Sequence, residues 1–173
     1  MKNTLRYSVL AFGLAGLLSA CGGGDEGIVV ENKEPTPTGA SASGTVAGAT
    51  AADTVLNGAY ATSSINLNNV TKVNPIGEHE TCRFRFSGLQ QVGSDRLMDG
   101  DLRYLPGTNA MDTTFVSIAT VEFKLTGTAG AVVDKPNNQV VFTGAVLTST
   151  QDTGRSITLT ATIPIRGNRP EGC

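Results

Sequence analysis

Strict alternation of apolar and polar residues is the feature of this 173-residue chain that most limits its fold. Along Ser156–Ile165 every second residue is apolar, and the residues between them are hydroxylated except for Pro164. A period of two is typical of a β-strand that buries one face. Cys82–Phe86 shows the same period, with Arg83 and Arg85 on the polar face. After the N-terminal segment, no window of about ten or more residues has the period of an amphipathic helix, so the sequence predicts an all-β fold.

Turn residues separate the alternating segments and indicate how they are arranged. Leu105–Asn109, Lys135–Asn138 and Gln151–Gly154 each contain Pro, Gly, Asn or Asp, which suit tight turns. Because short connections favour antiparallel neighbours, we expect an antiparallel sandwich or small barrel of about six to eight strands. The expected strands are Val55–Tyr60, Ser64–Val70, Cys82–Leu89, Leu97–Leu105, Thr114–Leu125, Ala131–Val133, Gln139–Ser149 and Arg155–Ile165.

The N-terminus has the layout of a secretory signal. Lys2 and Arg6 precede an apolar run over Val9–Leu18, and small residues lead into Cys21. An apolar run of about ten residues is too short to cross a hydrocarbon core, which needs about 20 residues. We therefore expect residues 1–20 to be a targeting segment that is cleaved from the mature protein.

The sequence Leu18-Ser19-Ala20-Cys21 resembles the lipobox of bacterial lipoproteins. The resemblance implies cleavage before Cys21, transfer of diacylglyceryl to its sulfur, and acylation of the new amino terminus. Two or more acyl chains hold a protein on a lipid bilayer almost permanently. Because Gly22 and not Asp follows Cys21, the resemblance implies sorting to the outer membrane of a bacterial envelope. An ordinary signal peptide with an incidental cysteine is the alternative.

The segment after Cys21 is dominated by Gly, Ser, Thr, Ala, Pro and acidic residues. Such a composition buries too little apolar surface to offset the entropy lost on ordering. We therefore expect residues 21–52 to be a lipidated cysteine and a flexible tether, and residues 53–173 to be the β domain. A coil of about 30 residues has a root-mean-square span of about 30 Å, which would lift the domain clear of the lipid.

Two of the expected strands, Thr114–Leu125 and Gln139–Ser149, are apolar on both faces. A strand with one face in water does not need this composition. Either the domain covers the second face of these strands, or the second face is an exposed patch for a protein partner.

Cys82 and Cys173 are the two cysteines that remain once Cys21 is lipidated. Because the bacterial envelope is oxidising, an even pair of cysteines predicts a disulfide. The bond would close a loop of about 90 residues, for which the chain-entropy model gives about 4 to 5 kcal/mol. No Cys-x-x-Cys motif supports the alternative of a redox-active pair.

His79, the only histidine of the sequence, is the first candidate catalytic residue. It stands between Glu78 and Glu80 in a polar loop before a predicted strand. In a catalytic role it would be a general base oriented by one of these carboxylates. Neighbours in an extended chain do not face one another, so an exposed loop histidine is the alternative.

Asp95, Asp99 and Asp101 are the second group of candidate residues, with Gly100 suited to a tight turn between them. These carboxylates could serve a hydrolase as acid and base, or donate oxygens to calcium. Their spacing does not match an EF-hand loop, and one histidine with two bridged cysteines cannot supply the usual zinc ligands. We therefore expect no metal site and no cofactor, and a solvated turn is the alternative to a catalytic cluster.

The remaining features favour binding over catalysis. A net charge of −2 and a pI of about 5.3 provide no basic surface for nucleic acid. The sequence contains no nucleophile motif of the common hydrolases and no phosphate-binding loop. We therefore expect an envelope-anchored lipoprotein whose small β domain acts by binding or structural association, with the lipid bilayer and a protein as partners. The alternatives are an envelope hydrolase that uses the acidic cluster, and a lipocalin-like carrier with an enclosed apolar cavity for a small ligand.

Overall fold

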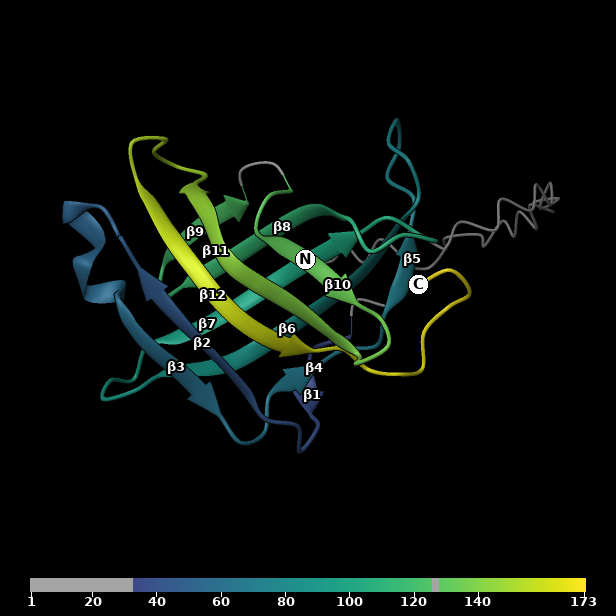
Figure 1. The fold of residues 1–173 in the computed structure, drawn as a ribbon, viewed down its shortest axis with the longest axis horizontal. Coiled ribbons are helices and arrows are strands. Elements are labelled where there is room, and N and C mark those ends of the chain that lie inside the picture. The colour runs from purple at the N-terminus through teal and green to yellow at the C-terminus, as the bar shows by residue number, and fades with distance from the viewer. Residues whose placement is uncertain (1–32, 126–127) are drawn as a thin grey trace, which may run out of the picture.

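The computed structural model describes residues 33–125 and 128–173, which form a closed antiparallel barrel of eight strands (Figure 1). The predicted all-β antiparallel fold is therefore confirmed, in its barrel form. The strands of the ring are β2 (Ala42–Ala47), β3 (Gly58–Thr62), β6 (Thr81–Gln91), β7 (Leu97–Tyr104), β8 (Met111–Ile118), β9 (Val121–Leu125), β11 (Gln139–Ser149) and β12 (Ser156–Pro164). Shorter elements accompany the ring: β1 (Thr36–Pro37), the 3-10 helix η1 (Ala51–Leu56), β4 (Asn66–Leu67), β5 (Thr71–Val73) and β10 (Ala131–Asp134).

The ring follows the order of the chain, as in an up-and-down barrel. Each ring strand pairs with the next one, and β12 then pairs back with β2 to close the ring. β4 and β5 pair with β6 beyond the end of β3, and β10 pairs with β11 beyond the end of β9. These short strands lengthen the barrel wall at the end that lies away from η1.

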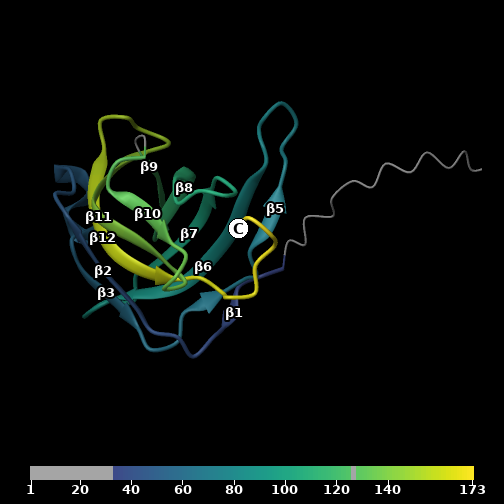
Figure 2. The ribbon, with the colours of Figure 1, turned by 45° about the vertical axis from the view of Figure 1, so that its right-hand side comes forward.

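Side chains fill the interior of the barrel. The ring strands curve around the barrel axis (Figure 2). Alternate residues of these strands point inward and form one contiguous buried cluster. A barrel of about eight strands is just wide enough for side chains to fill it. The largest fully buried side chains include Tyr60, Phe84, Phe86, Tyr104, Phe123 and Phe142.

The expected boundary between tether and domain is wrong, because the barrel begins earlier in the chain. β1 and β2 lie within residues 21–52, and β2 is a full member of the ring. Ala42 and Val46 are buried, and a Cβ at Gly44 would lie only 2.7 Å from the Cβ of Ala161 on β12. Close packing between strands requires small residues here, and these same residues have the composition of a flexible segment.

The expected strand Thr114–Leu125 is in fact a hairpin of two strands. β8 and β9 meet at a turn that contains Ala119, whose φ is +55°. The turn resets the alternation, so Val116 is buried before it and Phe123 is buried after it. Because no Gly, Pro, Asn or Asp marks this turn, the sequence pattern does not reveal it.

A β-bulge explains the second two-faced segment, Gln139–Ser149. The pairing of β11 with β12 shifts register between Phe142 and Ala145, where Gly144 has a φ of +62°. Phe142 and Ala145 are therefore both buried, although they are three positions apart. The apolar residues on both sides of the pattern come from this change of phase and not from a covered outer face, and Val146 is left 49% exposed.

Two further segments contain less strand than expected. Val55–Tyr60 begins in η1 and becomes strand only from Gly58, while Ser64–Val70 contains only the short β4. The side chain of Leu56 in η1 is buried, and the Leu56 carbonyl accepts a hydrogen bond of 2.8 Å from the hydroxyl of Tyr60. The helix thus turns inward and closes an end of the barrel.

Candidate functional site

Outward-facing side chains of β6, β7, β8 and β9 line an open groove of about 340 Å³, which we call the charged groove. Alternation places these side chains outside because the residues between them point into the core. The groove contains two of the three aspartates of the acidic cluster, so it is the candidate functional site. Its lining residues include Arg83, Arg85, Asp99, Asp101, Phe115 and Glu122.

Asp101 is held by an arginine of the neighbouring strand. Arg85 lies opposite Asp101 in the register of β6 and β7, and Arg83 lies diagonal to it. The Nε of Arg83 donates to the two carboxylate oxygens of Asp101 at 2.9 and 3.0 Å, and its Nη2 donates to Oδ2. These hydrogen bonds raise the pKa of Arg83. Both oxygens of Asp101 are thus engaged in an ion pair that links β6 to β7.

Asp99 and Asp95 do not take part in that ion pair. Oδ1 of Asp99 accepts a hydrogen bond of 3.0 Å from the backbone N–H of Gly88, where the register of β6 and β7 shifts. Asp95 lies in the turn between β6 and β7 and lines a different open groove, of about 540 Å³. The structure therefore brings Asp99 and Asp101 to one groove and places Asp95 in another.

Gly100 does not form the expected turn, because it lies within β7. It stands opposite Phe86 in the register, and a Cβ at this position would overlap the Phe86 ring. The glycine leaves room for an aromatic side chain in the core. The expectation of a solvated turn between Asp99 and Asp101 is therefore wrong, and both aspartates belong to a regular strand.

The segment that leads into the barrel lies at the rim of the charged groove. Glu34 and Pro35 belong to the groove lining, and the backbone carbonyl of Lys33 accepts a hydrogen bond of 2.9 Å from Nη2 of Arg85. The same Nη2 lies 3.7 Å from Oε1 of Glu34. Arg85 thus binds both a main-chain carbonyl and a carboxylate of an extended segment.

His79 is paired with a residue from another strand. Its Nε2 lies 2.8 Å from Oδ1 of Asp112, near the start of β8, and its side chain is 61% exposed. Glu80 instead forms an ion pair of 3.0 Å with Lys72. The histidine is therefore oriented from β8 and not by Glu78 or Glu80, as a catalytic role would require, and its exposure fits the alternative of an exposed loop histidine. His79 and Asp112 are not among the lining residues of the charged groove, so the candidate catalytic residues do not form one site.

A buried ion pair that sequence reasoning missed closes one end of the barrel. Asp53 of η1 is 3% exposed, and the Nε of Arg155 donates to its carboxylate at 2.7 Å. The side-chain amide of Gln91 donates to two backbone carbonyls of the segment around the end of η1. Hydrogen bonds from Arg155 lower the pKa of Asp53 in spite of its burial. The two residues are 102 positions apart, so no local pattern could have paired them.

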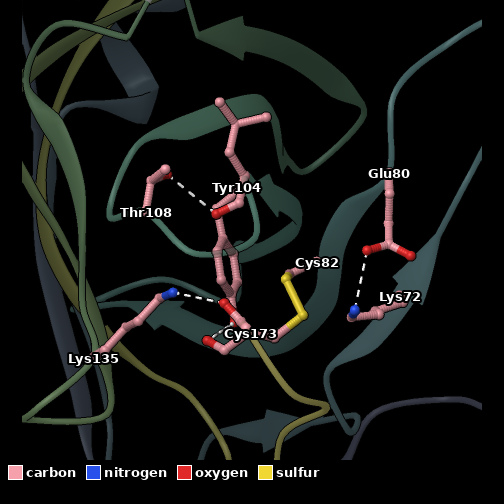
Figure 3. The surroundings of a disulfide bond; sticks show 9 residues. Lys72, Glu80, Cys82, Tyr104, Thr108, Lys135 and Cys173 are labelled. Atoms are coloured by element: carbon pink, nitrogen blue, oxygen red, sulfur yellow. Dashed lines mark hydrogen bonds and ion pairs between the residues drawn. A yellow bond between two sulfur atoms is a disulfide. The ribbon is translucent and has the colours of Figure 1, made fainter.

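Residues 165–173 follow β12, and Cys173 lies beside Cys82 and Tyr104 (Figure 3). A disulfide joins Cys173 to Cys82 of β6, which confirms the predicted pair. The hydroxyl of Tyr104 donates to the carbonyl of Cys173 at 2.9 Å, and Nζ of Lys135 donates to the carbonyl of Gly172 at 2.8 Å. Burial raises the pKa of Tyr104 to about 12 and lowers the pKa of Lys135. These contacts hold the segment in place.

No family model, curated protein or solved structure matches the chain. Within residues 33–125 and 128–173, no group of three or more His, Cys, Asp or Glu side chains is placed to hold a metal ion. The same part of the chain contains no helix of the length and apolarity needed to cross a bilayer. The expected signal at residues 1–20 and the expected lipidation site at Cys21 lie outside the described residues.

Proposed function

We propose that the protein is a lipoprotein of the bacterial envelope, anchored in the outer membrane through acyl chains on Cys21. In this proposal the barrel acts by binding or structural association and not by catalysis. The lipobox-like sequence Leu18–Cys21 and the short apolar segment before it support the anchor. The lipid bilayer is then one partner, and a protein of the envelope is the other.

The observation that carries the proposal is that two carboxylates of the barrel, Asp53 and Asp101, are engaged in ion pairs and that its interior is packed. Asp101 is bound by Arg83, Asp53 is bound by Arg155, and apolar side chains fill the interior. A hydrolase needs an acid or base that is free to exchange a proton with its substrate. A carrier needs space inside for its ligand. The outer surface is therefore the part of the barrel that is available for function.

The charged groove is the binding surface that we propose. Its lining includes the cation Arg85, the acidic residues Asp99 and Glu122, and the aromatic Phe115. Arg85 already donates to a backbone carbonyl, that of Lys33. Guanidinium and carboxylate groups around an aromatic side chain suit the backbone and the mixed charges of an extended peptide. We therefore propose that the groove binds a segment of a partner protein.

The proposed anchor lies closer to the barrel than the composition indicates. About 12 residues separate Cys21 from Lys33, which already contacts β6 through Arg85. A coil of about 12 residues has a root-mean-square span of only about 20 Å, compared with about 30 Å for a tether of about 30 residues. The proposal thus places the barrel close to the membrane surface and not on a long stalk.

Mass spectrometry of the exported protein tests the anchor. We expect residues 1–20 to be absent and the mass of Cys21 to be increased by acyl chains. We also expect the protein to float with lipid vesicles, and the substitution Cys21→Ser to abolish flotation while the circular dichroism of the barrel is unchanged. An unmodified Cys21 or a retained leader would refute the anchor.

Site-specific photocrosslinking in cells tests the binding role. We expect a crosslinker at Ser117 in the groove to form protein adducts, and one at Thr160 on β12 to form none. Arg85→Ala should abolish the adducts, whereas the double substitution of His79 and Asp95 by Ala should leave them and the cellular function unchanged. Loss of function in the double variant with an intact groove would instead favour an envelope hydrolase.

A further inference from the structure

The hairpin of β5 and β6 extends beyond the barrel wall, as two views show (Figures 1 and 2). Its tip is a turn over Pro75–Glu78, in which the N–H of Glu78 donates to the carbonyl of Pro75 at 3.0 Å. Gly77 has a φ of +83°, as the third residue of a type II turn requires. Ile76 is the second residue of this turn, so its side chain stands at the corner.

Ile76 is exposed at the tip of a hairpin that side-chain contacts hold in place. Its relative exposure is 104%, and the next most exposed large apolar residue of the described chain is Val92, at 67%. An ion pair of 3.0 Å between Lys72 and Glu80 joins the two sides of the hairpin, and His79 links the hairpin to β8. The turn therefore presents an apolar side chain to the surroundings of the barrel in a defined direction.

The hairpin lies within reach of the proposed anchor. The carbonyl of Lys33 is bound by Arg85, and β6 runs from Arg85 to Thr81 toward the tip of the hairpin. The four residue steps from Arg85 to Thr81 cover about 13 Å along the strand, and the turn at Pro75–Glu78 lies a few residues beyond Thr81. A chain of about 12 residues between Cys21 and Lys33 reaches up to about 40 Å. A lipid-bound Cys21 and Ile76 can therefore meet the surface of one bilayer.

We propose that Ile76 and its turn insert into the interfacial region of the bilayer that carries the acyl anchor. This inference rests on the proposed anchor at Cys21. A short connection holds the hairpin near the lipid at a millimolar effective concentration, so a single apolar side chain can bias the orientation of the barrel. Glu78 belongs to the turn, whereas the charge of Glu80 is paired with Lys72, so the lipid surface that the tip fits is zwitterionic and not anionic.

The absence of tryptophan from the sequence allows a direct test. The full lipidated chain with Ile76→Trp is bound to phosphatidylethanolamine and phosphatidylcholine vesicles whose acyl chains carry bromine. Bromine in the acyl chains quenches an indole only when it passes the lipid headgroups, so nearness to the surface is not sufficient. Val92→Trp is the matched control, because Val92 is exposed but lies just beyond the opposite end of β6.

We expect bromolipids to reduce the fluorescence at position 76 by about twofold and to leave the fluorescence at position 92 almost unchanged. Circular dichroism confirms that both variants fold. Protein that floats with the vesicles but shows no quenching at position 76, or equal quenching at both positions, would overturn the hairpin contact alone. Protein that does not float would refute the anchor, and the hairpin contact with it.

Discussion

The ion pair of Asp53 and Arg155 predicts a loss of stability whose size depends on which partner is removed. The side chain of Asp53 is 4% exposed, whereas that of Arg155 is 25% exposed. Arg155→Met leaves a carboxylate buried without its counter-ion, which costs about 3 to 5 kcal/mol. Asp53→Asn leaves a guanidinium that can turn toward water, so we expect a smaller cost of about 1 to 2 kcal/mol.

Urea denaturation of the two single variants and the double variant measures this asymmetry. The double variant has no orphaned charge, so its free energy of unfolding should be at least that of Arg155→Met alone. The coupling energy between the two sites should therefore be large. If Arg155→Met is as mild as Asp53→Asn, or if the two losses simply add, the carboxylate of Asp53 is not buried beside Arg155 as described.

The same pair predicts how stability depends on pH. Hydrogen bonds from Arg155 lower the pKa of Asp53 in the folded protein, and an unfolded Asp titrates near about 3.9. Because the pKa of Asp53 is lower in the folded than in the unfolded protein, its ionisation adds to the free energy of unfolding. This contribution is complete above about pH 4 and is lost as the pH falls through the folded pKa. Melting temperatures between about pH 2 and 6 should fall more steeply for the native protein than for Asp53→Asn. Parallel curves would contradict this assignment.

Three further predictions concern the core and the other barrel end. Replacement of both Cys82 and Cys173 by Ser should lower the free energy of unfolding in urea by about 4 to 5 kcal/mol, because the disulfide joins residues 91 positions apart; a loss under about 1 kcal/mol would show that the closed loop adds little. Gly100→Val should cost about 1 to 3 kcal/mol in the same assay, because its side chain would overlap the Phe86 ring, and a neutral effect would contradict the packing. Absorbance at 295 nm should show that Tyr104 ionises only near pH 12, and stability should be lost as the pH rises from about 10 toward that value; titration near pH 10 in the folded state would show that the phenol is not buried.

The parts of the fold that could be predicted are those whose pattern has a local cause. The long strands β6 and β12 each bury one face along most of their length, so their side chains alternate in the sequence as they do in space. The disulfide of Cys82 and Cys173 was predictable because only two cysteines follow Cys21, and the envelope location that the sequence predicts favours their oxidation.

The parts that could not be predicted depend on neighbours that are distant in the chain. β2 has a glycine at position 44 where Ala161 of β12 lies too close for a side chain, and composition alone does not distinguish such a strand from a flexible segment. The bulge at Gly144 and the turn at Ala119 both change which residues face the core. No turn-forming residue around Ala119 reveals the second of these changes in the sequence. A model based on an uninterrupted period of two therefore misplaces both segments.

The candidate site shows the same division. The sequence alone determined which residues carry charge, including the aspartates at 99 and 101, and their alternate spacing put both on one face of a strand. Only the tertiary structure decided their roles, because it brings Arg83 to Asp101, Asp112 to His79, and Arg155 to Asp53. The physical reason is that an ion pair forms between groups that folding brings together, and the ring of strands joins residues that lie more than a hundred positions apart in the chain.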